Sequence, residues 1–200
     1  MSLILDPDKS YTFRSYFELP FAQEDILAEF GVGLERRSLS FDALPTDTSL
    51  LRTELEADLG LVDLESEAAR REILIAPVLT SLCRQVQARL KIEYPVAVNE
   101  QLKGSFDYYV QSRSNLLVVE AKNSDLMRGF TQLAVELIAL DQWVKSATPV
   151  LYGAVTTGEE WRFGMFYRQE KKVVRDINLY RVPADLDVLM GILVSILQAQ

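Results

Sequence analysis

The sequence predicts an α/β fold in which helices flank a central mixed β-sheet. Three long stretches carry apolar residues at the three-and-four spacing of amphipathic helices. Between them lie short runs rich in β-branched and aromatic residues, each bounded by turn formers. Read along the chain, these patterns give the α-β-β-β-α-β order, followed by further strands and a closing helix.

Length and composition favour one compact unit. The chain has 200 residues, of which 48% are apolar, enough to bury one sizeable core. We predict an N-terminal accessory segment over residues 1–62 and the main domain over residues 63–200. No stretch long enough to span a membrane lacks charges, and the first residues show no signal-peptide pattern. We therefore expect a cytoplasmic protein without a membrane partner.

Histidine is absent from the chain, and this excludes several kinds of catalytic site. Triads that rest on imidazole and imidazole-ligated zinc are ruled out, so chemistry would have to use carboxylates, lysine, tyrosine or a bound cation. The net charge of -8 opposes a broad electrostatic grip on nucleic acid. Cys83 is the single cysteine and lies in an apolar helical stretch, so we expect a core residue rather than a disulfide or zinc ligand.

The N-terminal part of the chain gives few clear signals. Residues 11–31 begin with alternating aromatic residues and then predict a short helix from Ala22 to Phe30, ended by Gly31. Residues 35–61 mix turn formers with short apolar runs. We predict a loop there, with one brief helix near Leu50 to Leu59.

The main domain begins with a long amphipathic helix from Ser66 to Leu90. Pro77 lies inside this helix and removes one backbone donor, so we expect a kink or a break there. Three strands follow, at residues 92–100, 104–111 and 115–123.

Helical spacing returns directly after these strands. The pattern predicts a second core helix over residues 126–145. Two strands over residues 149–168 surround a turn at Thr156 to Gly158, and residues 171–182 predict another strand. A closing helix is expected from Ala184 to Leu197.

Polar side chains that could carry chemistry lie on two neighbouring predicted strands. Glu120 and Lys122 point to the same face of an alternating strand, and Asp107 joins them if the preceding strand pairs through a turn at residues 112–115. Two carboxylates suit a magnesium ion, and a lysine beside them could position or help deprotonate an attacking water. The alternative is an ordinary ion pair at a strand end, with Asp107 an unrelated turn residue.

The motifs GSFDYYV, NLLVVEAKN and TQLAVEL resemble the PD-(D/E)XK nuclease superfamily, over roughly residues 65–168. Within it, ESEAARREILIAPVL and YGAVTTGEEWRFGMFY resemble the N-terminal nuclease region of type I restriction subunits. The proline of the family's name is absent, since Phe106 precedes Asp107. The nucleotide-binding motif GxxxxGK[ST] is also absent, so the resemblance does not imply ATP-driven translocation.

The resemblance implies a restriction-endonuclease-like core and a PD-(D/E)XK nuclease-like domain over residues 63–200. It also implies a catalytic set of five residues: Asp107, Glu120, Lys122, Glu67 and Gln132. Asp107, Glu120 and the carbonyl of Ala121 are the implied ligands of Mg²⁺, with Mn²⁺ as a substitute. Two other acidic residues stay open as alternatives to Glu67, namely Glu72 and Glu100.

Several further residues near the motifs have two interpretations. The basic residues Arg128 and Lys103 either contact phosphate or belong to the ordinary surface. Trp161 and Tyr109 either stack on bases or pack in the core, as aromatic residues in strands usually do. In each case the structural interpretation is the simpler one.

The expected function is a divalent-metal-dependent nuclease that hydrolyses phosphodiester bonds, with DNA as the partner. Cleavage of both strands needs two sites, which leaves a homodimer open. The negative charge motivates an alternative, a catalytically silent nuclease-fold module that binds proteins or DNA ends. A third hypothesis is a structural α/β domain with a chance E-x-K.

Overall fold

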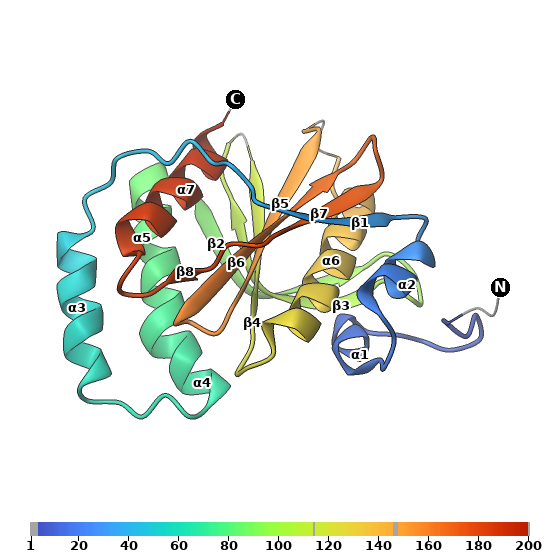
Figure 1. The fold of residues 1–200 in the computed structure, drawn as a ribbon, viewed down its shortest axis with the longest axis horizontal. Helices are drawn as coiled ribbons and strands as arrows, with labels where there is room; N and C mark the ends of the chain where they lie inside the picture. The colour runs from blue at the N-terminus through green and yellow to red at the C-terminus, as the bar shows by residue number, and fades with distance from the viewer. Residues whose placement is uncertain (1–3, 114, 146–147, 200) are drawn as a thin grey trace.

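The computed structural model describes residues 4–113, 115–145 and 148–199. The chain forms three layers, with a mixed β-sheet between two layers of helices (Figure 1). The predicted α/β class and its central mixed sheet are therefore confirmed. Between Glu67 and Thr156 the elements follow the predicted α-β-β-β-α-β order.

The sheet has eight strands, in the order β1-β7-β6-β5-β4-β3-β2, with β8 paired to β6. The pairs β1·β7 and β4·β5 are parallel, and the other pairs are antiparallel. The strand bounds are β1 Gly33–Arg37, β2 Arg89–Ala97, β3 Lys103–Gln111, β4 Leu116–Ala121, β5 Val150–Thr156, β6 Glu160–Tyr167, β7 Lys172–Asp176 and β8 Tyr180–Arg181.

Each face of the sheet has its own set of helices and its own apolar core (Figure 1). One face carries α1 (Phe13–Glu18), α2 (Gln23–Ala28) and α6 (Leu126–Trp143). The other carries α3 (Ser49–Leu59), α4 (Glu67–Arg70), the π-helical turn η1 (Arg71–Ile75), α5 (Ala76–Val86) and α7 (Leu186–Gln198). The side chains of β4 alternate between the two cores, so Glu120 shares the α6 face with Val118.

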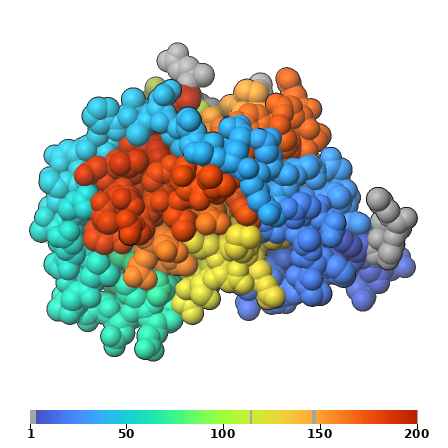
Figure 2. All heavy atoms as spheres, viewed as in Figure 1, coloured from blue at the N-terminus to red at the C-terminus, as the bar shows by residue number. Residues whose placement is uncertain are grey.

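Residues 1–62, predicted as an accessory segment, contribute directly to the sheet and to its helical cover. The predicted loop over residues 35–61 is wrong at its start, because Gly33–Arg37 is the edge strand β1. Its sequence GLERR lacks strand alternation, and it is held by parallel pairing with the distant β7. The aromatic stretch also contains α1, which buries Phe13 and Tyr16. Figure 2 shows this N-terminal segment, in blue, against the yellow start of α6.

The long helix predicted from Ser66 to Leu90 is present in three parts. Ser66 caps α4, since its hydroxyl accepts a hydrogen bond from the Ala69 N–H at 3.1 Å. The wider π turn η1 lies immediately before Pro77 and accommodates the missing proline donor, which explains the predicted break. The helix ends at Val86, and residues from Arg89 onward already belong to β2. Cys83 is half-buried and packs against the core.

Helix α6 is buried along most of its length, because the sheet covers one side of it and α1 packs on another. A helix so enclosed should be apolar all round. Three of its buried residues are polar instead, namely Thr131, Gln132 and Glu136. In the described ranges no helix is both long and apolar enough to cross a membrane.

Candidate functional site

The candidate site lies where β3 and β4 separate. Their last paired residues are Tyr108 and Val119, so Asp107 and Glu120 follow just beyond the ladder. The Asp107 carboxylate accepts a hydrogen bond from the Ala121 N–H at 2.8 Å. A side chain thus replaces the missing strand partner. The predicted pairing of the two strands is confirmed, and it brings Asp107 beside Glu120 and Ala121.

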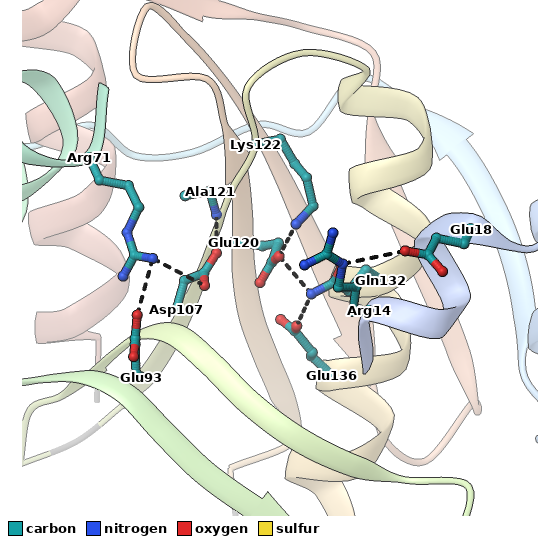
Figure 3. A network of polar contacts seen from close by, with 10 residues as sticks. All are labelled: Arg14, Glu18, Arg71, Glu93, Asp107, Glu120, Ala121, Lys122, Gln132 and Glu136. Carbon is teal, nitrogen blue, oxygen red and sulfur yellow. Dashed lines mark hydrogen bonds and ion pairs between the residues drawn. The ribbon is translucent and has the colours of Figure 1, made fainter. Parts of the chain in front are cut away.

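The Glu120 carboxylate is the centre of a buried polar network (Figure 3). This residue is only 1% exposed. Its Oε1 accepts hydrogen bonds from the Gln132 Nε2, at 2.6 Å, and from the Lys122 ammonium. Its Oε2 has no donor among the described residues. Glu120 and Lys122 therefore share one face, as strand alternation predicts, and α6 contributes the third member.

Burial and neighbouring charges change the protonation of this network. Burial raises the pKa of Glu120 well above its usual value, and the charges of Glu136 and Asp107 raise it further. Burial by itself would lower the pKa of Lys122, but the charge and hydrogen bond of Glu120 outweigh it, so the Lys122 pKa is raised. Lys122 is consequently an ammonium at neutral pH, which suits positioning and charge neutralisation better than proton abstraction.

Glu136 is a member of the network that the sequence reasoning missed. The Gln132 Nε2 donates a second hydrogen bond to its Oε1 at 2.9 Å. Burial raises the pKa of Glu136 to about 8, although the neighbouring Glu120 carboxyl and the hydrogen bond from Gln132 act against this rise. The available signal was its position one helical turn after Gln132 in an otherwise apolar stretch.

Arg71 holds Asp107 from the side opposite Gln132 (Figure 3). Its Nη1 lies 3.9 Å from Asp107 Oδ1 and 3.3 Å from Glu93 Oε1. The guanidinium also lies over the Tyr108 ring, 5.2 Å from its centroid. Sequence reasoning missed this residue too, because the π turn η1 decides which side chains of the first helix face the sheet.

A cavity of about 480 Å³ opens onto the two carboxylates. Asp107, Glu120, Lys122 and Gln132 line it together with Glu67, which stands in the first turn of α4. In the described part of the chain, no hydrogen bond or ion pair joins Glu67 to the carboxylates. The opposite wall comes from α1, where the Phe17 ring centroid lies 5.3 Å from the Lys122 Nζ. All five predicted site residues thus face one space, four of them as members or neighbours of one network.

The alternatives to Glu67 lie elsewhere. Glu72 is exposed and lines a separate cavity on the α3 side of the sheet. Glu100 is exposed and pairs with Lys103 at 2.7 Å. Neither carboxylate lines the cavity at Glu120.

The proposed stacking role of the two aromatic residues is contradicted. Trp161 is fully buried, and its Nε1 donates to the Gly158 carbonyl at 3.1 Å. Tyr109 is buried beside Tyr94 in the sheet core. The surface assignment of Arg128 fits, since it is exposed and its Nε lies 3.6 Å from Asp125.

Three buried side-chain oxygens of the site are available as ligands for a hard cation such as Mg²⁺. Among the described residues no hydrogen-bond donor reaches Glu120 Oε2, Gln132 Oε1 or Glu136 Oε2. Such carboxylate and amide oxygens are the ligands that Mg²⁺ prefers. No three His, Cys, Asp or Glu side chains of the described residues are grouped to hold a metal ion. A metal here would rest on two carboxylates, completed by backbone, water or substrate oxygens, which is the usual arrangement for magnesium.

Comparison with known proteins adds no family to these observations. No protein-family model, no curated protein and no solved structure matches this chain. A function for it therefore has to be argued from the chemistry of the site.

Proposed function

We propose that this chain is a divalent-metal-dependent nuclease with a PD-(D/E)XK site on a restriction-endonuclease-like core, and that it hydrolyses phosphodiester bonds of DNA. One observation carries the proposal: a buried glutamate, Glu120, bonded to Lys122 and Gln132 and adjacent to Asp107 in an open cavity. An incidental ion pair at a strand end would be solvated. Burial of these charges is costly unless a ligand or a metal makes use of them.

The residues that would hold the metal are Asp107 and Glu120, with the Ala121 carbonyl as the third protein ligand. A bound Mg²⁺, or Mn²⁺ in its place, would stabilise negative charge on the phosphate and lower the pKa of a bound water. The unpartnered Glu120 Oε2 and its neighbouring oxygens support this assignment.

The chain's own residues would prepare the reaction around that centre. Lys122, kept cationic by Glu120, would hold a phosphate oxygen and align the attacking water. Gln132 and Arg71 fix the two carboxylates from opposite sides. Glu67 faces the cavity at a position from which it would bind a water in the same space.

A second candidate function is a catalytically silent module that binds DNA ends or a protein. The observation that favours it is that Glu120 Oε1 already accepts hydrogen bonds from Lys122 and Gln132, which leaves this oxygen less available to a metal ion. The net charge of -8 points the same way. Binding of DNA without cleavage in either metal would support this candidate over the nuclease.

We also propose where this protein acts and in which oligomeric state. A DNA nuclease of this type would act in the cytoplasm, and cleavage of both strands would require a homodimer on the duplex. Linear product formed together with nicked circles would indicate paired sites, whereas nicked circles alone would indicate single sites.

Plasmid cleavage tests the metal site. Asp107→Asn removes one ligand charge with little change in shape, and we expect cleavage of supercoiled plasmid in Mg²⁺ or Mn²⁺ to fall roughly 100-fold or more. Asp42→Asn is the matched control, because Asp42 is exposed and does not line the cavity. Equal loss in both variants, or no loss in Asp107→Asn, would remove Asp107 from the mechanism.

A further inference from the structure

Three arginines lie side by side on the sheet face that carries α2 and α6. Arg36 of β1 is the register partner of Arg175 of β7. Arg175 is in turn opposite Gly164 of β6, and Arg162 stands two residues before that glycine on the same face. We call Arg36, Arg162 and Arg175 the arginine row.

Two members of the arginine row have no acidic partner. Arg175 is only 7% exposed, and its Nη1 donates a hydrogen bond to Gln23 Oε1 at 2.6 Å. Arg162 is half-buried and its Nη1 contacts the Met127 sulfur at 3.5 Å, a weak acceptor. The Nε atoms of both residues are buried without an acceptor, and neither forms an ion pair among the described residues. Buried guanidinium groups are rarely left in this condition.

The arginine row also repels itself. Burial lowers the pKa of Arg175, and the charges of Arg36 and Arg162 lower it further, while the charge of Glu24 only partly offsets them. Among the described residues, the one ion pair of the arginine row joins Arg36 to the exposed Glu24 of α2. In a chain with a net charge of -8, this is a concentration of positive charge that the protein leaves largely uncompensated. An anion from outside the chain would supply what is missing.

The sheet register places the arginine row close to the candidate site. Glu120 of β4 is aligned with Val155 of β5, which is aligned with Arg162 of β6. Two strand spacings correspond to about 10 Å across the sheet. A second cavity, of about 740 Å³, shares Asn123 and Ser124 with the cavity at Glu120. Its charged lining residues are the bases Arg162, Arg70 and Arg181 and the acids Asp125, Glu159 and Glu160. The two adjoining cavities therefore connect Lys122 to Arg162.

We propose that the arginine row, through Arg162, binds a backbone phosphate of the same nucleic acid strand whose scissile phosphate lies at Glu120; this rests on the proposed nuclease function. A single strand of B-DNA carries one charge per about 3.4 Å of helix axis, so a phosphate within about three nucleotides of the scissile one lies at a separation of about 10 Å. Arg175 and Arg36 lie behind Arg162 and strengthen the positive potential there.

Salt-dependent DNA binding tests this site directly. A labelled DNA duplex is titrated with the parent and with Arg162→Gln in EDTA, where a metal-dependent nuclease binds without cutting. Loss of one phosphate contact should lower the slope of log K against log salt by about 0.9 and weaken binding roughly tenfold. Arg84→Gln is the matched control, since Arg84 is exposed on α5, across the sheet, and its loss changes the net charge equally.

Stability of the free protein distinguishes a binding role from a structural one. Because Arg162 repels Arg175 and lacks an acidic partner, Arg162→Gln should leave the melting temperature unchanged or raise it, whereas loss of a structural arginine would lower it. Arg162→Lys keeps the charge and should retain most of the salt slope. Duplex should raise the melting temperature of the parent more than inorganic phosphate does at the same phosphate concentration.

The outcomes separate this site from the catalytic proposal. An unchanged salt slope in Arg162→Gln overturns the arginine site even if the parent cleaves plasmid. A reduced slope in a parent that cleaves nothing supports the arginine site and sinks the nuclease. If inorganic phosphate stabilises the parent as strongly as duplex does, the arginine row binds a free anion and the DNA assignment is overturned. A parent that binds no duplex also overturns the DNA assignment.

Discussion

Two polar clusters lie on the same face of the sheet. They differ in the sign of their buried charge and in the strands and helices that build them. The network at Glu120 has an excess of buried acid, and the arginine row has an excess of buried base. The first is built from one strand and the helix that follows it, whereas the second needs three strands that pair across the chain. The opposite charge within each cluster is incomplete: Lys122 lies beside two buried glutamates, and only Arg36 of the arginine row forms an ion pair among the described residues. A metal ion and a phosphodiester strand would supply both partners at once.

The largest expected effect concerns the pH dependence of stability at the acidic cluster. Glu136 has a pKa of about 8 in the fold, so its contribution to the free energy of unfolding is complete below about pH 4.5 and is lost as the pH rises towards 8. We expect the parent to lose a few kcal/mol over this interval in EDTA, and Glu136→Gln to lose less.

Urea unfolding at several pH values measures this difference. Glu54→Gln is the control, since Glu54 is exposed on α3. Parallel pH profiles for the parent and Glu136→Gln would show that the Glu136 carboxyl is not held neutral by burial.

A smaller effect is expected where α6 touches Lys122. A Cβ on Gly129 would lie 2.8 Å from the Lys122 Cγ and equally close to the Val155 Cγ2. Gly129→Ala should therefore cost about 1–3 kcal/mol of stability and, by displacing Lys122, reduce cleavage roughly 10- to 100-fold.

The matched control for this substitution is Gly33→Ala in β1, where a Cβ would meet nothing within 4 Å. Thermal melting and plasmid cleavage are compared for the two variants. Normal cleavage by a folded Gly129→Ala protein would mean that the position of Lys122 is not critical.

The smallest effect is expected at the edge of the arginine row. Glu24 pairs with Arg36, and both side chains are about half exposed. Glu24→Gln should change stability by less than about 1 kcal/mol, because exposed ion pairs contribute little. Removal of the acid should strengthen duplex binding about twofold to fivefold at low salt. Weaker binding would show that the row does not face the DNA.

The different origins of the two clusters explain how much of each could be predicted from sequence. Glu120 and Lys122 are two residues apart on one strand, and alternation alone puts them together. The position of Asp107 beside them could be predicted from the antiparallel pairing of β3 with β4. Glu136 and Arg71 depend on the rotation of a helix about its axis and on a π turn, neither of which spacing reveals.

The arginine row could not be predicted from local sequence patterns, because its members come from segments far apart in the chain. Arg36 and Arg175 become neighbours only because β1 inserts in parallel beside β7, a pairing between segments far apart in the chain. Residues 35–37 of β1 were predicted as part of a loop, because three consecutive charged residues show no strand alternation and the strand is stabilised by its pairing with β7. The central helices and strands were predictable, since each carries a clear apolar period of its own.

Cleavage of supercoiled plasmid by the parent and by Lys122→Ala is the most direct test of the central claim. We expect the parent to cut in Mg²⁺ and to stop in EDTA, and the variant to bind DNA while its cleavage falls roughly 100-fold or more. Equal cleavage by the two proteins, or cleavage by the parent that persists in EDTA, would contradict the assignment of a metal-dependent nuclease site at Glu120 and Lys122.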